Sequence, residues 1–152
     1  MTRKLAPELF ATVVRHTPLV SLDLVIRNSI GQVLLGERSN RPAMGKWFVP
    51  GGRIFKDESM AKAFARLTLE ELGHEFSLVQ AGFLGVFEHF YPDNALDEAF
   101  STHYVVLAYQ LSVNQEDLTH LPLMQHRSYR WFDVDELLSD EQVHVHTQWY
   151  FN

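Results

Sequence analysis

The residues best suited to chemistry lie in one stretch near the middle of the chain. Gly51 and Gly52 precede a segment rich in Ala, Leu and Glu, and a glycine-rich loop before a helix lets the backbone approach a diphosphate closely. Within the segment, Arg66 and Glu70 are one helical turn apart and can form an ion pair. Glu71 offers a hard oxygen ligand, and Mg²⁺ binds through one or two carboxylates plus phosphate oxygens. The stretch therefore predicts a divalent-cation site for a diphosphate.

Ordinary surface charge on a solvated amphipathic helix is the competing interpretation of this stretch. It explains Glu58 or Glu70 taken singly about as well as a functional site does. It explains poorly the combination of two glycines, an arginine and paired carboxylates at these offsets. The whole spacing therefore favours a site.

Basic residues near the glycines suggest the kind of ligand. Arg38, Arg41, Lys46 and Arg53 gather there, although the chain has a net charge of −6, with 13 Lys and Arg against 19 Asp and Glu. A nucleic-acid backbone needs clustered Lys and Arg to neutralise its phosphates. A local cationic pocket in an acidic protein suits a small anion better, so we expect no nucleic-acid partner.

The elements that must position these residues mix helices with strands. A helix is expected at residues 58–72, with Asp57 as its N-cap and Gly73 as a left-handed C-cap. Other helices are predicted at 7–16, from 133 to 138 and at 144–151. Strands are predicted at 19–27, 32–38, 81–91, 103–113 and 129–132, with an extended piece at 47–50 and the first two strands as a hairpin. This pattern favours a single domain over residues 1–152, of class α+β, as an α/β/α sandwich.

Composition excludes several classes of protein. The chain has no cysteine, which rules out disulfides and thiolate metal sites. No apolar run approaches the roughly 20 residues that a membrane-spanning helix needs. The basic start of the chain has no apolar stretch behind it, so we expect no signal peptide, no membrane partner and a cytoplasmic protein.

The stretch from Gly52 to His74 resembles the Nudix box, whose usual form is Gly-x5-Glu-x7-Arg-Glu-apolar-x-Glu-Glu-x-Gly-apolar. The resemblance implies the Nudix fold, with a mixed β-sheet core. Leu67 stands where the first helix Glu is usual, and Thr68 and His74 replace apolar residues. Typical members use that Glu as a metal ligand. Its replacement leaves Glu71 as the helix carboxylate for the metal and predicts fewer bound cations.

Further segments resemble the GDP-mannose mannosyl hydrolases among the Nudix enzymes. In that subfamily water attacks the anomeric carbon of the sugar and GDP leaves, whereas most Nudix enzymes attack phosphorus. The resemblance implies hydrolysis of GDP-mannose, and of GDP-glucose, to GDP and free sugar with inversion. It is carried by Arg66-Leu67-Thr68, Ala11-Thr12-Val13-Val14-Arg15, Asn40-Arg41-Pro42-Ala43-x-Gly45-x-Trp47-Phe48-Val49-Pro50-Gly51-Gly52-Arg53, Thr102-His103-Tyr104-Val105-Val106-Leu107 and Gln125-His126-x-x-Tyr129-Arg130-Trp131.

The same resemblance implies a metal site and a base. One Mg²⁺ per active site, for which Mn²⁺ can substitute, would be held by the Gly51 carbonyl, Glu71 and Gln125. His126 would be the general base for the attacking water, and the unperturbed histidine pKa of about 6.5 suits that task near neutrality. Arg38 would neutralise the departing diphosphate. Arg53 would share that role.

Other residues keep two interpretations. Asp23 lies in an apolar strand, where an unpaired acid would be costly to bury. It is either a core acid paired with an arginine or a contact to the sugar or leaving group. Tyr104 is either a half-buried strand residue or a donor to the diphosphate. Phe10 is a core residue by its pattern. By resemblance it belongs, with Lys4 and Leu5, to a segment that touches the nucleotide from a partner subunit, which implies a homodimer.

Two other functions compete with hydrolysis at carbon. A Nudix pyrophosphatase would cleave the P–O–P bond of a nucleotide sugar, but Leu67 replaces its expected ligand. A catalytically inactive nucleotide-binding regulator would keep only the fold. The retention of Arg53, Glu71, Gln125 and His126 argues against that second alternative.

Overall fold

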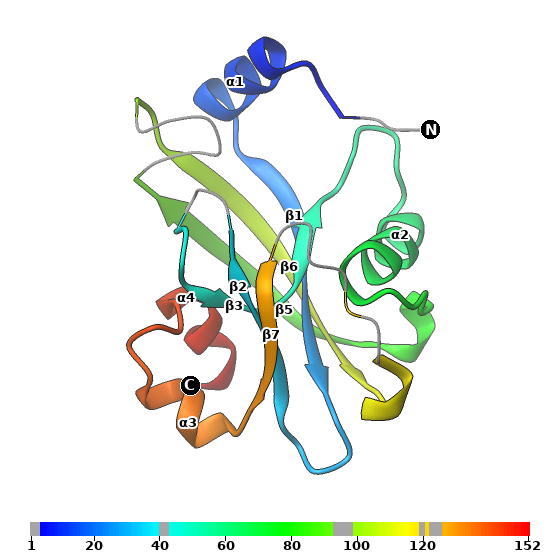
Figure 1. Cartoon of the computed structure of the whole chain (residues 1–152). Coiled ribbons are helices and arrows are strands. Elements are labelled where there is room, and N and C mark those ends of the chain that lie inside the picture. Colours follow the sequence, from blue (N-terminus) through cyan, green and yellow to red (C-terminus); the bar gives the residue numbers. More distant parts are fainter. Residues whose placement is uncertain (1–3, 40–42, 93–98, 119–120, 122–125) are drawn as a thin grey trace.

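The computed structural model describes residues 4–39, 43–92, 99–118, 121 and 126–152, with the side chains of 126 and 127 outside the description. A twisted mixed β-sheet forms its centre (Figure 1). Seven described strands join this sheet: β1 (Leu19–Arg27), β2 (Val33–Arg38), β3 (Trp47–Phe48), β4 (Gly51–Arg53), β5 (Gly82–Tyr91), β6 (Thr102–Ser112) and β7 (His126–Phe132).

The strand order places β1 at the centre of the sheet. The main path runs β3-β2-β1-β6-β5, while β4 also pairs with β1 and β7 with β2. β1 and β6 are parallel along their length, and the other pairs are antiparallel. The predicted hairpin of β1 and β2 is confirmed by the pairing of Arg27 with Val33. Residues 21–23 of β1 pair instead with β4, so β1 exchanges partners along its length and brings Asp23 opposite Gly51.

Helices cover both faces of the sheet, as the α/β/α prediction requires. α2 (Met60–Leu72) lies on one face, and α3 (Val134–Ser139) and α4 (Val145–Gln148) lie on the other (Figure 1). α1 (Pro7–His16) is beside the end of the sheet where β1 begins. None of the helices in the described ranges is long and apolar enough to cross a membrane.

Two apolar cores, one on each face, hold these layers together. The core beneath α2 joins its buried residues to β1 and β6 and includes Phe64, Leu67, Leu22, Leu24 and Tyr109. The second core includes Val25, Val33, Val49, Phe132 and Leu137. Alternate residues of β1 therefore enter opposite cores, as the period of two in a strand requires.

The ends of α2 are partly as predicted. Gly73 adopts φ +73° and its N–H donates to the Leu69 carbonyl at 3.0 Å, which confirms the left-handed cap. The predicted N-cap Asp57 is wrong, because Asp57 has φ +65° and an N-cap residue needs an extended backbone. Ser59 is the cap instead, and its Oγ accepts from the Lys62 N–H at 3.2 Å.

The helix predicted over 144–151 begins at Val145 and passes into a 3₁₀ turn, with helical backbone angles at Gln148 and Trp149. α4 ends at Gln148, and η3 (Trp149–Phe151), a 3₁₀ turn, follows it. Thr147 ties the segment to the sheet, because its Oγ1 accepts from the Val49 N–H at 3.2 Å. The remaining 3₁₀ turns are η1 (Leu78–Gln80) and η2 (Gln115–Leu118).

Candidate active site

A pocket lies where β4 meets β1, next to β5 and β6. It brings together residues far apart in the sequence, among them four of the predicted site residues. Its lining consists of Ser21, Asp23, Arg38, Phe48, Val49, Gly51, Gly52, His89, Tyr91 and Tyr104.

Close packing excludes a side chain at Gly51 and crowds one at Gly52. A Cβ built on Gly51 would lie 2.4 Å from the Leu22 carbonyl oxygen and 2.6 Å from Asp23 Oδ1. Relief would require β1 itself to move. A Cβ on Gly52 would lie 2.5 Å from Cδ2 of Leu67. The backbone of β4 is therefore pressed against both β1 and α2.

Leu67 is part of the core beneath α2. Its side chain is 3 % exposed and covers Gly52. This is the position at which the usual Nudix box has a glutamate. The protein thus has an apolar contact, in place of a carboxylate, between α2 and the glycine loop.

Glu71 lies one turn further along α2 and faces the same loop. Its side chain is buried, and Oε1 accepts a hydrogen bond from the Gly51 N–H at 3.3 Å. Burial raises the pKa of Glu71 to about 7, and the Gly51 hydrogen bond and Arg38 offset this only in part. A cation beside this carboxyl would favour its charged form. The position of Glu71 therefore fits a divalent metal ion.

The rest of the predicted metal site involves few acidic side chains. Across the described residues, no three His, Asp or Glu side chains are grouped so as to hold a metal ion. Two of the three predicted ligands, a backbone carbonyl and a side-chain amide, are not His, Asp or Glu side chains. The predicted metal site therefore does not depend on a cluster of three such side chains. Gln125, the predicted amide ligand, lies outside the described residues.

Asp23 projects into the pocket from β1. Its Oδ2 accepts a hydrogen bond from the Tyr150 hydroxyl at 2.5 Å. Burial raises the pKa of Asp23 to about 7, against the lowering effects of Tyr150 and of the positive charge on Arg38. Asp23 is thus near an arginine, as the structural interpretation expects, and also lines the pocket, as the functional one expects.

Arg38 and Tyr104 belong to the polar wall of the pocket, and Arg53 follows the two glycines at the end of β4. The guanidinium of Arg38 lies 5.8 Å from the centre of the Phe48 ring. Burial raises the pKa of Tyr104, and the positive charges of Arg38 and Arg53 offset part of that rise. Burial also lowers the pKa of Arg53. Both arginines therefore act electrostatically on Tyr104, which lines the pocket.

The N-terminal residues approach this wall through α1. Phe10 is half-buried, and its ring centre lies 5.3 Å from the Arg53 guanidinium. Lys4 is exposed and Leu5 half-buried just before the helix. Lys46, one of the basic residues near the glycines, does not line this pocket. Its Nζ donates to the Glu141 carbonyl at 3.0 Å.

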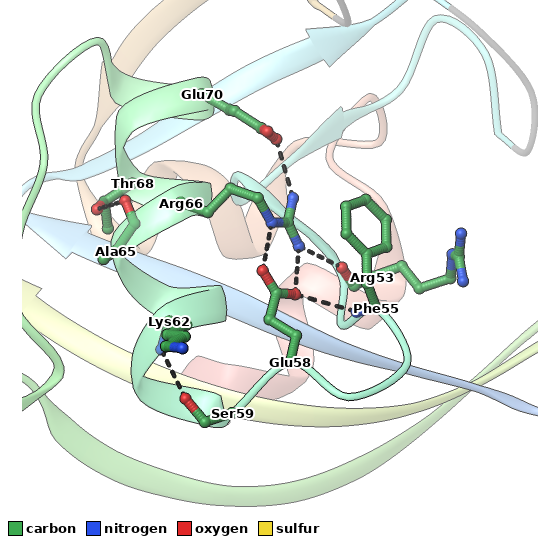
Figure 2. A network of polar contacts seen from close by, with 9 residues as sticks. All are labelled: Arg53, Phe55, Glu58, Ser59, Lys62, Ala65, Arg66, Thr68 and Glu70. Carbon is green, nitrogen blue, oxygen red and sulfur yellow. Dashed lines mark hydrogen bonds and ion pairs between the residues drawn. The ribbon is translucent and has the colours of Figure 1, made fainter. Parts of the chain in front are cut away.

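A network centred on Arg66 fixes the loop that leads into α2 (Figure 2). Arg66 donates to both carboxylate oxygens of Glu58, at 2.7 and 2.9 Å, and to Glu70 at 3.0 Å. It also donates to the Arg53 carbonyl at 2.8 Å and lies over the Phe55 ring. The predicted pair of Arg66 and Glu70 is confirmed, and Glu58 has a structural partner. This network clamps residues 53–58 onto the helix.

The predicted base lies at the start of β7. The backbone of His126 pairs with that of Arg38, which places this residue at the same end of the sheet as the pocket. Its side chain lies outside the described part of the structure, as does all of Arg41. The role of His126 therefore stays a prediction.

Several residues that line the pocket or contact its lining residues were missed from the sequence. His89 and Tyr91 alternate with exposed residues along β5, and this period of two was the signal that could have placed them on one face. Tyr150 reaches Asp23 across 127 residues of chain, and no local pattern marks that contact. His144 and His146 pack in the C-terminal segment, where the His144 ring lies 4.6 Å from that of Phe48.

Comparison with known proteins agrees with this geometry. The family model described as NUDIX domain matches residues 17–152. The chain belongs to the NUDIX family. Nudix hydrolases act on small-molecule nucleotide compounds and generally use divalent metal ions such as Mg²⁺. This chain is accordingly a Nudix hydrolase.

Individual proteins and solved structures resemble the chain to different degrees. The low-salt glycan biosynthesis protein Agl8 of Haloferax volcanii is 41 % identical over 117 residues, which cover 77 % of this chain and 73 % of that protein. The MutT protein of Methanosarcina mazei Go1 superposes with a TM-score of 0.69 at 24 % identity, covering 90 % and 92 % of the two chains. The NUDIX domain of Shewanella oneidensis NrtR, solved with ADP ribose, superposes with a TM-score of 0.65 at 20 % identity, covering 99 % of this chain and 96 % of that chain. These two structures support the Nudix fold.

Proposed function

We propose that this Nudix hydrolase converts GDP-mannose, and GDP-glucose, into GDP and free sugar by water attack at the anomeric carbon with inversion. The observation that carries the proposal is the buried side chain of Leu67 over Gly52. It leaves Glu71 as the α2 carboxylate beside the glycine loop. A site with that single helix carboxylate is poorly equipped to gather several cations around a phosphorus atom, so reaction at carbon is favoured.

The proposed cofactor is one Mg²⁺ per active site, with Mn²⁺ as a substitute. The Gly51 carbonyl, Glu71 and Gln125 would hold it, and the ion would neutralise charge that develops on the diphosphate. Glu71 brings the negative charge among these three ligands. The site would thus bind the cation chiefly together with a diphosphate, which supplies further oxygens.

The chain's own groups would divide the remaining work. His126 takes the proton of the attacking water as the new C1–O bond forms, and the old C1–O bond breaks with its electron pair passing to the diphosphate. Arg38, Arg53 and Tyr104 line or border the pocket and would stabilise the charge on this leaving group. Asp23 would contact the sugar or the leaving group from the pocket wall.

The nucleotide would extend towards α1. Phe10 and Arg53 already form a cation–π pair at 5.3 Å, and Lys4 and Leu5 precede the same helix. We assign these residues to nucleotide binding. The 41 % identical relative from Haloferax volcanii is named a glycan biosynthesis protein, and this name is in keeping with a sugar-bearing substrate.

The proposed assembly is a homodimer. β5 ends the main strand path, and its large apolar residues include Val86 and Phe90, which are 60 % and 57 % exposed. An apolar edge strand is a surface that proteins usually cover. Sedimentation equilibrium should give twice the monomer mass, and a mass of 17.6 kDa would contradict a dimer.

A panel of nucleotide sugars tests the proposed reaction. The purified protein with Mg²⁺ is incubated with GDP-mannose, GDP-glucose, ADP-glucose and UDP-glucose, and all products are identified by chromatography and NMR. We expect GDP and free sugar, with the two GDP-sugars cleaved fastest. GMP with a sugar 1-phosphate would instead establish the pyrophosphatase alternative. Binding without turnover of any compound would establish an inactive regulator.

A further inference from the structure

The C-terminal segment contacts Asp23, an acid that lines the pocket, through the side chain of Tyr150. Tyr150, in η3, donates a hydrogen bond from its hydroxyl to Oδ2 of Asp23 at 2.5 Å. The other carboxylate oxygen, Oδ1, faces Gly51, whose missing Cβ would lie 2.6 Å from it. The Asp23 carboxylate is therefore held between β4 on one side and the C-terminal segment on the other.

Tyr150 is itself held in place by β5. Its ring meets the Phe87 ring edge to face, with centres 4.7 Å apart and planes at 88°. Its hydroxyl lies 3.3 Å from Nε2 of His89, a buried residue of the same strand. The His89 ring stacks on that of His146 in α4, with centres 4.3 Å apart. The hydroxyl thus has a defined position before any ligand enters.

We propose that Tyr150 is a positioning residue: its hydroxyl fixes the orientation of the Asp23 carboxylate in the pocket, so that the C-terminal segment completes the active site. This inference rests on the proposed function, in which Asp23 contacts the sugar or the leaving group. A carboxylate turns about its side-chain bonds unless a partner holds it, and misorientation of a group that meets the substrate slows reaction strongly. Tyr150 acts through Asp23 and does not itself touch the substrate.

A Tyr150→Phe variant separates the hydroxyl from the ring. The phenyl ring keeps the contact with Phe87, whereas the hydrogen bond to Asp23 is lost. We expect kcat for the nucleotide sugar to fall about 10-fold, with KM changed less than about twofold, because orientation acts on the transition state more than on binding. Tyr109→Phe is the matched control: Tyr109 packs against Phe64 in the core beneath α2 and should keep wild-type kcat.

A double-mutant cycle tests whether the effect passes through Asp23. In an Asp23→Asn background, adding Tyr150→Phe should lower kcat by less than about twofold, since the group to be oriented has already been altered. A 10-fold loss in both backgrounds, or an unchanged kcat in the single variant, would overturn the proposal. These expected ratios of kcat between variant and parent are the same whichever bond of the substrate breaks. Failure of the cycle is therefore distinct from failure of the proposed reaction, which product identification detects.

Proton NMR gives a readout that does not depend on turnover. A tyrosine hydroxyl proton held by a carboxylate should resonate far downfield in the wild-type protein. We expect that signal to vanish in Tyr150→Phe, to shift in Asp23→Asn and to persist in Tyr109→Phe. A signal that is indifferent to Asp23→Asn would show that the hydroxyl does not hold this carboxylate.

Discussion

Two neighbouring acids on α2 have opposite surroundings. Glu70 forms an ion pair with Arg66, which also donates hydrogen bonds to Glu58. Burial acts to lower the pKa of Arg66, but these two acids outweigh it and raise that pKa. Glu71 points instead towards Gly51, and burial raises its own pKa to about 7. Charges that meet their partners hold the loop on the helix. A charge that folding withdraws from water is a better candidate for chemistry.

The largest expected effect is a difference in enzymatic activity between variants of these two acids. Glu71→Gln should lower kcat about 10³-fold, since a bound metal ion contributes several kcal/mol to the transition state. Glu70→Gln is the matched control and should lose less than about threefold, because the Glu70 side chain is 53 % exposed and pairs with Arg66 instead of facing Gly51. Steady-state rates across a Mg²⁺ titration would show the difference. Similar losses in the two variants would remove the contrast between the loop clamp and the metal site.

The next effect concerns the predicted base. His126→Ala should lower kcat about 10²-fold, the usual size of a general-base contribution. Mg²⁺ affinity, measured by calorimetry with GDP present, should hardly change, because the proposed ligands remain. Near-normal kcat in this variant would take His126 out of the mechanism.

The buried carboxyl of Glu71 should also make the stability of the protein depend on pH. The pKa of Glu71 is raised from 4.5 to about 7, so the folded state binds an extra proton between those values and stability falls as pH rises through that window. Glu71→Gln removes this loss. In metal-free buffer above pH 7 the variant should be more stable than the wild type by about 1–3 kcal/mol, and at pH 4 the gain should vanish. Urea unfolding at both pH values measures it, and a variant that is less stable above pH 7 would contradict the account.

Buried histidines of β5 and of the C-terminal segment make the stability depend on pH in the opposite sense. Burial lowers the pKa of His89 to about 3, and those of His144 and His146 to about 4. Their contribution to stability is present above the ordinary value of 6.5 and is lost as pH falls below it. The histidines are the same in Glu71→Gln and in the wild type, so their contribution cancels when the two proteins are compared at one pH.

The smallest expected effects lie in the loop clamp. Arg66→Gln should destabilise the protein by about 2 kcal/mol, because it leaves the buried side chain of Glu58 without its charged partner. Glu70→Gln should cost less than about 1 kcal/mol, since the Glu70 side chain is 53 % exposed. Thermal unfolding of both variants tests this order. A larger loss for Glu70→Gln would mean that the clamp depends on the exposed acid.

Local patterns were enough to predict most of the fold. Periodicity located the main helices and strands, and Gly73 marked the end of α2 through its freedom to adopt positive φ. The N-cap was missed because Asp57 and Ser59 both suit that position, and only the backbone angles distinguish them.

Local spacing predicted the part of the site that lies on α2, whereas Asp23, Arg38 and Tyr104, which lie on three different strands, were named through the family resemblance. The offsets among Arg66, Glu70 and Glu71 follow from helix geometry. The contact of Tyr150 with Asp23 depends on how the C-terminal segment packs on the sheet, which is a tertiary property without a local signal. The position of His89 required knowing which face of β5 meets the pocket.

Isotope labelling tests the central claim, cleavage at carbon, most directly. GDP-α-D-mannose is hydrolysed in ¹⁸O-water, and both products are analysed by mass spectrometry while rapid proton NMR follows the sugar. A base that activates water on the face opposite the leaving group gives a single displacement with inversion. The label should therefore enter mannose and be absent from GDP, and the first sugar detected should be the β-anomer. Label in a phosphate, with GMP and mannose 1-phosphate as products, would contradict the account.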